Sequence, residues 1–274
     1  MSEVFVGSSA VADGLLSRHE LQKWYRPIFR DVYVPKATTV TLRDRTVGAW
    51  LSTHGQGVIA GVAASGLHGS NWVDADIGIE LISRHLRPQP GLVVRTETLA
   101  PDEITRIARL PVTTRARTAF DLGRHQPRGD ALARMDTLMR SMVFSTEDVL
   151  LLAKRYSGAR GIRQLRELLP LVDGGAASPQ ESLLRLAFVD AGLPKPVTQL
   201  PIADSRGYLV RIVDMAWEEF KVAAEYDGEQ HQTSRYQYRK DAGYCPSWRA
   251  WGGTWCAHSK RTAALTSPPR PALS

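Results

Sequence analysis

Cysteine and long apolar stretches are both scarce in this sequence. Among its 274 residues only Cys245 and Cys256 are cysteines, too few for a disulfide framework or a cysteine-rich zinc site. No apolar run approaches the ~20 residues that a membrane-spanning helix needs. Residues 1–12 have neither the basic start nor the apolar stretch of a secretory signal. We therefore expect a cytoplasmic protein without a membrane partner.

Acidic residues are absent from residues 242–274, a segment that contains four of the 35 lysines and arginines. The net charge of the whole chain is +7, so this segment supplies more than half of the positive excess. Such an excess indicates a polyanionic partner, although the signal is weak because part of it belongs to the tail alone. The content of 43% hydrophobic and 23% charged residues excludes a chain that is disordered throughout.

Helix caps and an alternating segment indicate how the first part of the chain folds. Ser17 and Glu20 have the spacing of a capping box, which predicts the start of a short helix. Residues 30–35 alternate between apolar and polar side chains, as a strand does. Further along, Gly123 is expected to end a helix. The helix and strand near the N-terminus could form a minimal winged helix or simply begin a larger domain.

A glycine- and alanine-rich break at residues 173–177 separates two expected domains, and the length of the chain supports about two domains. The mixture of helical and alternating segments predicts the α/β fold class, in the α+β mixed form. The predicted parts are a winged-helix-like unit (1–40), a small α/β domain (41–125), a helical connector (126–175), a C-terminal domain of strands and helices (176–241) and an aberrant tail (242–274).

Carboxylates gather in two predicted strands of the C-terminal domain, at residues 208–217 and 221–226. Side chains alternate along a strand, so Glu225 and Asp227 lie on one face. A hairpin between the strands would bring Asp214 close to this pair. Three crowded carboxylates repel one another, and a hard divalent cation such as Mg²⁺ or Mn²⁺ relieves the repulsion.

A divalent cation held by Asp214, Glu225 and Asp227 could activate water for attack on a phosphodiester. His231 could orient that water or transfer a proton. Glu181 could assist the metal. Each of these residues also has a structural interpretation. Glu181 occupies the third position of a helix that Ser178 caps, so it could serve only to cap that helix. In the same way, Asp214 could bind backbone amides, and His231 could be a surface residue.

These segments resemble the very-short-patch-repair-like endonucleases of the PD-(D/E)XK nuclease superfamily. The resemblance is carried by Ser-Pro-Gln-Glu at 178–181, Val-Asp-Met-Ala-Trp at 213–217 and Ala-Glu-Tyr-Asp-Gly-Glu-Gln-His at 224–231. The superfamily motif ends in lysine, whereas this chain has Asp227 there, as that subgroup does. The resemblance implies a restriction-endonuclease-like mixed sheet flanked by helices, and metal-dependent hydrolysis of DNA. The catalytic residues it implies are Glu181, Asp214, Glu225, Asp227 and His231.

The first 125 residues resemble AbiEi-type antitoxins. The resemblance is carried by residues 14–21, 30–35, 63–69 and 110–122. It implies a winged-helix unit followed by an α/β domain, binding to DNA, and a cognate toxin or other protein as partner. The phosphate contacts expected in the winged-helix unit are Arg18, His19, Lys23, Arg26 and Arg30, although solvated surface charge explains these residues equally well.

The tail departs from the endonuclease pattern, which calls for a helix and a last strand after residue 241. Residues 244–262 show neither helical nor strand periodicity. One permitted set of codons for residues 245–262, read one base earlier, encodes LPKLEGLGWNVVRAFKED, which matches the missing end. We therefore interpret the tail as the product of a frameshift, and the underlying DNA sequence tests this directly. A lost strand would expose a sheet edge, so an impaired nuclease is expected.

Three functions follow from the sequence. The leading hypothesis is a metal-dependent DNA endonuclease, inactivated to some degree by its altered C-terminus. The alternative is a non-catalytic, antitoxin-type transcriptional regulator that binds DNA through its N-terminal unit. The third is a pseudogene product with no activity.

Overall fold

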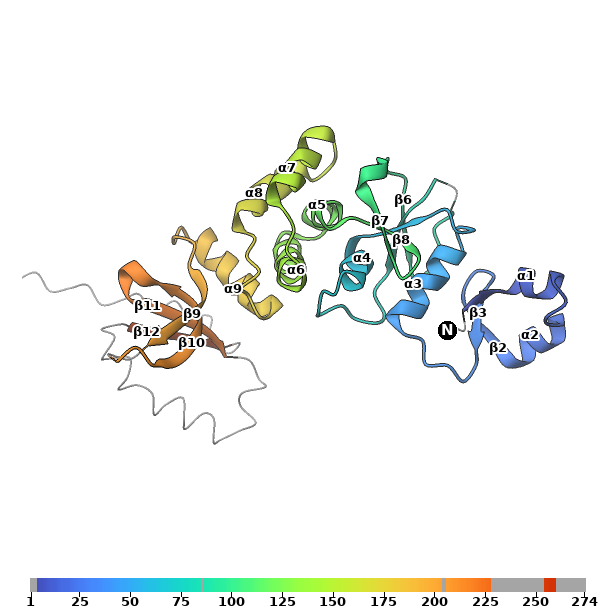
Figure 1. The fold of residues 1–274 in the computed structure, drawn as a ribbon, viewed down its shortest axis with the longest axis horizontal. Helices are drawn as coiled ribbons and strands as arrows, with labels where there is room; N and C mark the ends of the chain where they lie inside the picture. The colour runs from blue at the N-terminus through green and yellow to red at the C-terminus, as the bar shows by residue number, and fades with distance from the viewer. Residues whose placement is uncertain (1–3, 85, 204–205, 228–253, 260–274) are drawn as a thin grey trace, which may run out of the picture. The chain divides into compact units, whose positions relative to one another are not determined.

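The computed structural model describes residues 4–84, 86–203, 206–227 and 254–259. The chain forms two compact units, Met1–Gly174 and Gly175–Ser274. Both contain helices together with sheets (Figure 1), and parallel and antiparallel strand pairs occur in the same sheet. The α/β fold class, in its α+β mixed form, is therefore confirmed. The helices of the described ranges are all too short or too polar to cross a membrane.

The chain of unit 1 begins with two short helices and a three-stranded antiparallel sheet of order β1-β3-β2. Ser17 Oγ accepts the backbone N–H of Glu20 at 3.2 Å, so the predicted capping box is present. Asp31 has a φ of 59° in the turn between the last two strands. The elements are β1 (Phe5–Val6), α1 (Gly7–Ala12), α2 (Arg18–Trp24), β2 (Tyr25–Phe29) and β3 (Val32–Pro35).

A five-stranded mixed sheet of order β6-β5-β4-β8-β7 forms the centre of unit 1. Its apolar side chains share one core with the first sheet, since Val34 packs in the same cluster as Ile59, Leu81 and Val112. The elements are α3 (Leu42–Leu51), β4 (Val58–Ala60), α4 (Gly61–Leu67), β5 (Ile79–Ile82), β6 (Leu92–Arg95), η1 (Pro101–Glu103), β7 (Ile104–Ile107) and β8 (Leu110–Thr113).

Four helices and a 3₁₀ turn complete unit 1, and α5 contacts each of the other three helices. They are α5 (Arg115–His125), α6 (Arg128–Ser141), α7 (Thr146–Arg155), α8 (Ile162–Leu168) and η2 (Leu169–Leu171). Gly123 lies inside α5, so the prediction that it ends the helix is wrong. The reason is packing: a Cβ there would lie 2.3 Å from Leu165 Cδ1, so glycine lets α8 approach α5.

We expect Gly123→Ala to destabilise the protein by about 1–3 kcal/mol, because the buried Leu165 would have to move within a packed core. Urea unfolding measures this loss. Gly158→Ala is the matched control, since nothing lies within 4 Å of a Cβ at that position. Equal stability of the two variants would contradict the packing argument.

Unit 2 contains one long helix and a four-stranded sheet of order β12-β11-β10-β9. A small core of Ile202, Val213, Ala216 and Ala223 holds the sheet together. The elements are α9 (Pro179–Asp190), β9 (Val197–Ala203), β10 (Leu209–Trp217), η3 (Glu218–Phe220), β11 (Val222–Asp227) and β12 (Thr254–Ser259).

The strand β12 corrects one expectation about the tail. Thr254–Ser259 pairs in parallel with β11, from Val222↔Thr254 to Asp227↔Ser259, although the sequence there lacks strand periodicity. Pairing satisfies the backbone groups along β11 that would otherwise form an open edge. The rest of the tail, residues 242–253 and 260–274, lies outside the described residues, so the frameshift hypothesis stays a prediction.

Candidate functional site

The hairpin expected to gather carboxylates forms between β10 and β11. Its register pairs Met215 with Ala224, which places Asp214 opposite Glu225 on the same face. The backbone N–H of Tyr226 donates to Asp214 Oδ2 at 2.8 Å, and Arg211 Nη2 lies 2.6 Å from Glu225 Oε1. Asp214 thus binds a backbone amide, as the structural interpretation expected, and both Asp214 and Glu225 have a protein partner.

Glu181 lies buried at the start of α9 and has a structural role. Its Oε2 accepts the N–H of Ala177 at 2.8 Å, and its Oε1 accepts the hydroxyl of Ser178 at 3.0 Å. Gln199 Nε2 donates to Oε2 as well, at 3.3 Å. Each carboxylate oxygen therefore accepts a hydrogen bond at the helix start, which leaves little of the group available for a metal.

The described residues of unit 2 contain no group of three side chains placed to hold a metal ion. The side chain of Asp227 and the whole of His231 lie outside the described residues. The site of Asp214, Glu225 and Asp227, the role of His231, and the choice of Mg²⁺ or Mn²⁺ therefore stay predictions.

The basic residues predicted to contact DNA lie in α2 and the hairpin after it. Arg18 and Lys23 are exposed on α2, and Arg30 is exposed at the turn between β2 and β3. Arg26 differs, because its side chain is half-buried and Nη2 donates to the carbonyl of Thr38 at 2.9 Å. Three of the four arginines and lysines in this set thus present their charge to solvent.

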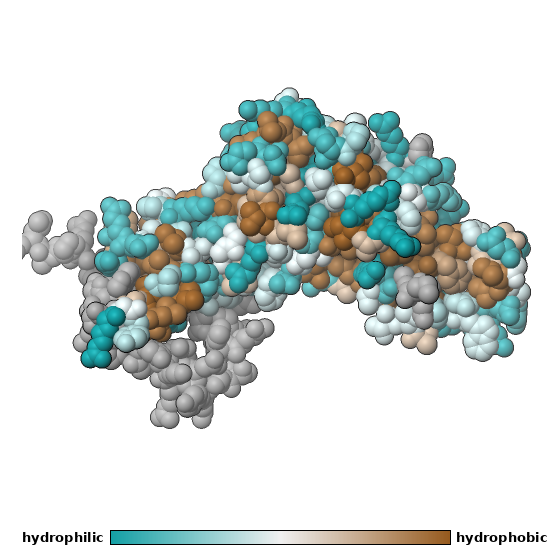
Figure 2. Space-filling view, in the orientation of Figure 1, coloured by the Kyte–Doolittle hydropathy of each residue, from teal (hydrophilic) through white to brown (hydrophobic). Residues whose placement is uncertain are grey.

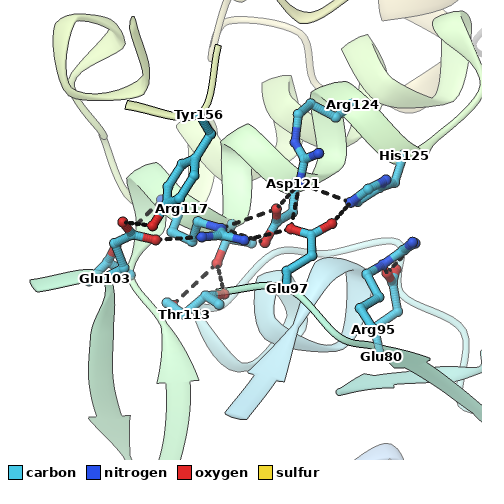
Figure 3. Close-up of polar contacts among 12 residues, drawn as sticks. Glu80, Arg95, Glu97, Glu103, Thr113, Arg117, Asp121, Arg124, His125 and Tyr156 are labelled. Atoms are coloured by element: carbon cyan, nitrogen blue, oxygen red, sulfur yellow. Dashed lines mark hydrogen bonds and ion pairs between the residues drawn. The ribbon is translucent and has the colours of Figure 1, made fainter. Parts of the chain in front are cut away.

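A buried cluster of arginines and carboxylates in unit 1 was not expected from the sequence (Figure 3). At its centre Arg117 projects from α5 with 1% of its side chain exposed. Its Nε lies 3.0 Å from Asp121 Oδ2, its Nη2 lies 2.7 Å from Glu97 Oε2, and its Nη1 binds Glu103 Oε2. One guanidinium thereby joins α5 to the segment after β6 and to η1.

Arg124, about two turns along α5, reaches two of the same carboxylates, those of Glu97 and Asp121. Its Nη2 lies 2.7 Å from Glu97 Oε2, 2.9 Å from Asp121 Oδ1 and 3.0 Å from His125 Nε2. These three partners could hold a metal ion, since one ligand atom of each lies within 4.8 Å of the others. However, Arg124 Nη2 contacts all three, so a cation of the protein already takes that position. The cluster does not fit a resident metal.

Burial and ion pairing act in opposite directions on the pKa values of the carboxyl groups in the cluster. Burial alone would raise the pKa of Glu97, but the hydrogen bond from His125 and the charges of Arg124, His125 and Arg117 lower it to about 2. Burial raises the pKa of Asp121, in spite of its two arginine partners. The lowered pKa therefore keeps Glu97 ionised, whereas the raised pKa of Asp121 favours its protonated form.

Two spacings in the sequence are partial signals for this cluster. Arg117 and Asp121 are four residues apart, and Asp121 and Arg124 are three apart, so all three share one face of a helix. Glu97 and Glu103 reach them from a separate segment, and no local spacing could place those two carboxylates.

Residues 56–171 match the family of the AbiEi antitoxin C-terminal domain. Two curated relatives are 39% identical over 142 residues: the uncharacterized proteins MT2308 and Rv2248, of Mycobacterium tuberculosis strains CDC 1551 / Oshkosh and ATCC 25618 / H37Rv. That stretch covers 52% of this chain and 51% of each relative, so the chain spans about half the length of the relatives it matches.

The family match ends at residue 171, before the segment 178–241 that resembles endonucleases, and none of these comparisons supports that resemblance. The match covers residues 63–69 and 110–122, two of the four segments on which the antitoxin resemblance rests, whereas residues 14–21 and 30–35 lie before it. It also spans every residue of the arginine cluster. The part of the chain that contains this cluster is therefore similar to the AbiEi antitoxin C-terminal domain.

Proposed function

We propose that the protein is an antitoxin-type regulator that binds DNA through its N-terminal unit and a partner protein through the domain that follows. The match of residues 56–171 to the AbiEi antitoxin C-terminal domain carries this proposal. The arrangement of two helices and a hairpin before that domain supports it, because this is the order of elements in a winged helix.

The charge on the N-terminal unit supports contact with DNA. Arg18 and Lys23 extend from α2 into solvent, and Arg30 does so from the turn of the hairpin. A helix inserted in a groove and a hairpin against the backbone would each meet phosphate oxygens there. Arg26 would contribute less, since its guanidinium is bonded to Thr38.

Exposed apolar side chains support a protein partner for the second domain. Brown patches interrupt the hydrophilic surface of unit 1 in Figure 2. Val143, just before α7, is 75% exposed, and Leu151 on α7 is 59% exposed. Exposed apolar side chains that gather in one region often mark contact with another protein. In an antitoxin-type protein, the partner would be the cognate toxin.

Binding to DNA from the protein's own promoter region tests the first part of the proposal. We expect Arg18→Ala with Lys23→Ala to weaken binding and to reduce the slope of log affinity against log salt by about 2, since each lost phosphate contact removes ~0.9. Fluorescence anisotropy across a salt series measures the slope. Lys154→Ala, which removes an exposed charge from α7, is the control. An unchanged slope in the double variant would exclude α2 as the contact.

A metal-dependent nuclease is the second candidate, and the register that places Asp214 opposite Glu225 favours it. The same DNA with added Mg²⁺ separates the two functions. Cleavage that is lost in both Asp214→Ala and Glu225→Ala would support the nuclease, whereas salt-sensitive binding without cleavage would support the regulator.

A further inference from the structure

A cavity of about 690 Å³ lies beside the arginine cluster of unit 1. Small-molecule sites usually have volumes of roughly 300–1,000 Å³. Four arginines and one carboxylate, that of Glu97, line the cavity. The arginines are Arg95 at the end of β6, Arg117 and Arg124 on α5, and Arg160 between α7 and α8. This composition indicates an anionic ligand rather than a cation.

Donors remain available in this lining after the internal pairs are made. A guanidinium has five N–H donors. Arg95 uses Nε and Nη2 for Glu80, which leaves Nη1. Arg124 is 6% exposed, and its Nε is buried without a hydrogen-bond partner among the described atoms. This atom is enclosed, so Arg124 contributes positive charge to the cavity wall and not a donor that a ligand can reach.

Arg160 supplies the charge that is not already neutralised. Its side chain is exposed, and within the described ranges no carboxylate pairs with it. Its backbone carbonyl accepts Arg124 Nη1 at 3.1 Å, which ties this residue to the cluster. The position of Arg160 at the cavity is thus fixed through its main chain, while its guanidinium is available.

The arginines of the cluster are held in place before any ligand arrives. The carboxylates of Asp121 and Glu97 fix the guanidinium of Arg124, so little side-chain entropy remains to be lost on binding. Glu97 is itself bound by Arg117, Arg124 and His125, so its charge is neutralised locally. Planar guanidinium groups bind phosphate oxygens well because several N–H groups can point at one anion.

We propose that this cavity binds a small phosphate-bearing anion, with Arg160 as the main donor and Arg95 Nη1 beside it, while the enclosed guanidinium of Arg124 contributes positive charge to the wall. Inorganic phosphate and the phosphates of a nucleotide share this chemistry, and the two are separate arms of the test. The site is distinct from the DNA contacts of α2, and the proposal does not depend on the antitoxin function.

Isothermal titration calorimetry on the full chain tests the proposal with two probes, inorganic phosphate and ATP, each against chloride at matched ionic strength. We expect one saturable site for at least one probe. Arg160→Gln should raise the dissociation constant of the bound probe about tenfold or more, because the exposed guanidinium is lost while the main-chain bond to Arg124 stays. Saturation by phosphate alone would show that the phosphate group suffices, and saturation by ATP only would show that the larger ligand is recognised.

The matched control is Arg163→Gln, an arginine on α8 whose side chain is 94% exposed and which does not line the cavity. The probe should bind this variant with the same dissociation constant as it binds the unaltered protein. Absence of saturation by both probes would overturn the proposal. An Arg160→Gln variant that binds as tightly as the unaltered protein would overturn it as well, since binding would then occur elsewhere.

Discussion

Replacing Arg117 with alanine is expected to lower the free energy of unfolding by about 3–5 kcal/mol, the range for removing one partner of a buried ion pair. The substitution leaves Asp121 and Glu103, which are 1% and 2% exposed, without their central cation. Glu97 loses one of its partners too. This loss of stability exceeds the loss from replacing an ordinary surface arginine, because the carboxylates that remain stay desolvated.

Two further substitutions separate charge from packing at this position. The guanidinium of Arg117 lies 5.3 Å from the ring centroid of Phe120 and 5.2 Å from that of Tyr156, so part of the loss comes from contacts with these rings. Arg117→Met keeps an unbranched apolar side chain about as long as the aliphatic part of arginine, so it should recover only part of the packing and none of the ion pairing. Arg117→Lys keeps the charge but cannot reach three carboxylates at once, and we expect an intermediate loss.

Urea unfolding near neutral pH measures these differences, with Arg163→Ala as the control for loss of an exposed arginine. The control should change stability by no more than about 0.5 kcal/mol. A loss below about 1 kcal/mol for Arg117→Ala would mean that the cluster is not a stabilising element of unit 1.

Local patterns in the sequence predicted the parts of the fold that depend on neighbouring residues. Ser17 and Glu20 form the expected capping box because both groups lie within one turn of helix. The hairpin of β10 and β11 follows from alternation and a short connection, and its register places Asp214 opposite Glu225. In each case the residues whose pattern predicts the structure are close neighbours in the chain.

Features that depend on distant residues could not be predicted in this way. Gly123 has the signature of a helix end, but the approach of Leu165 from another helix explains its place inside α5. The arginine cluster depends on Glu97 and Glu103, which lie outside α5 and look like ordinary surface acids in the sequence. A strand at Thr254–Ser259 forms because β11 offers backbone partners, although the sequence of this segment lacks the apolar–polar alternation of a strand.

The stability of unit 1 should depend on pH through Glu97. The pKa of this carboxyl is about 2 in the folded protein against an ordinary value of 4.5. A lowered pKa in the folded state stabilises the protein above pH 4.5, and this contribution is lost as the pH falls from 4.5 towards 2. The shift corresponds to a contribution on the order of 3 kcal/mol, at 1.36 kcal/mol for each pH unit.

The comparison of the unaltered protein with Glu97→Gln isolates this effect, because other carboxyl groups titrate in both. Asp121 would act in the opposite direction, since burial raises its pKa and favours its protonated form. We expect the unaltered protein to be the more stable near neutral pH, and the difference to shrink below pH 4.5. Urea unfolding across a pH series measures it, with Glu167→Gln, a residue 54% exposed on α8, as the control. A difference that stays constant between neutral pH and pH 3 would show that the ionised Glu97 does not stabilise the fold through Arg117 and Arg124, because ~1.5 kcal/mol or more should be lost over that range.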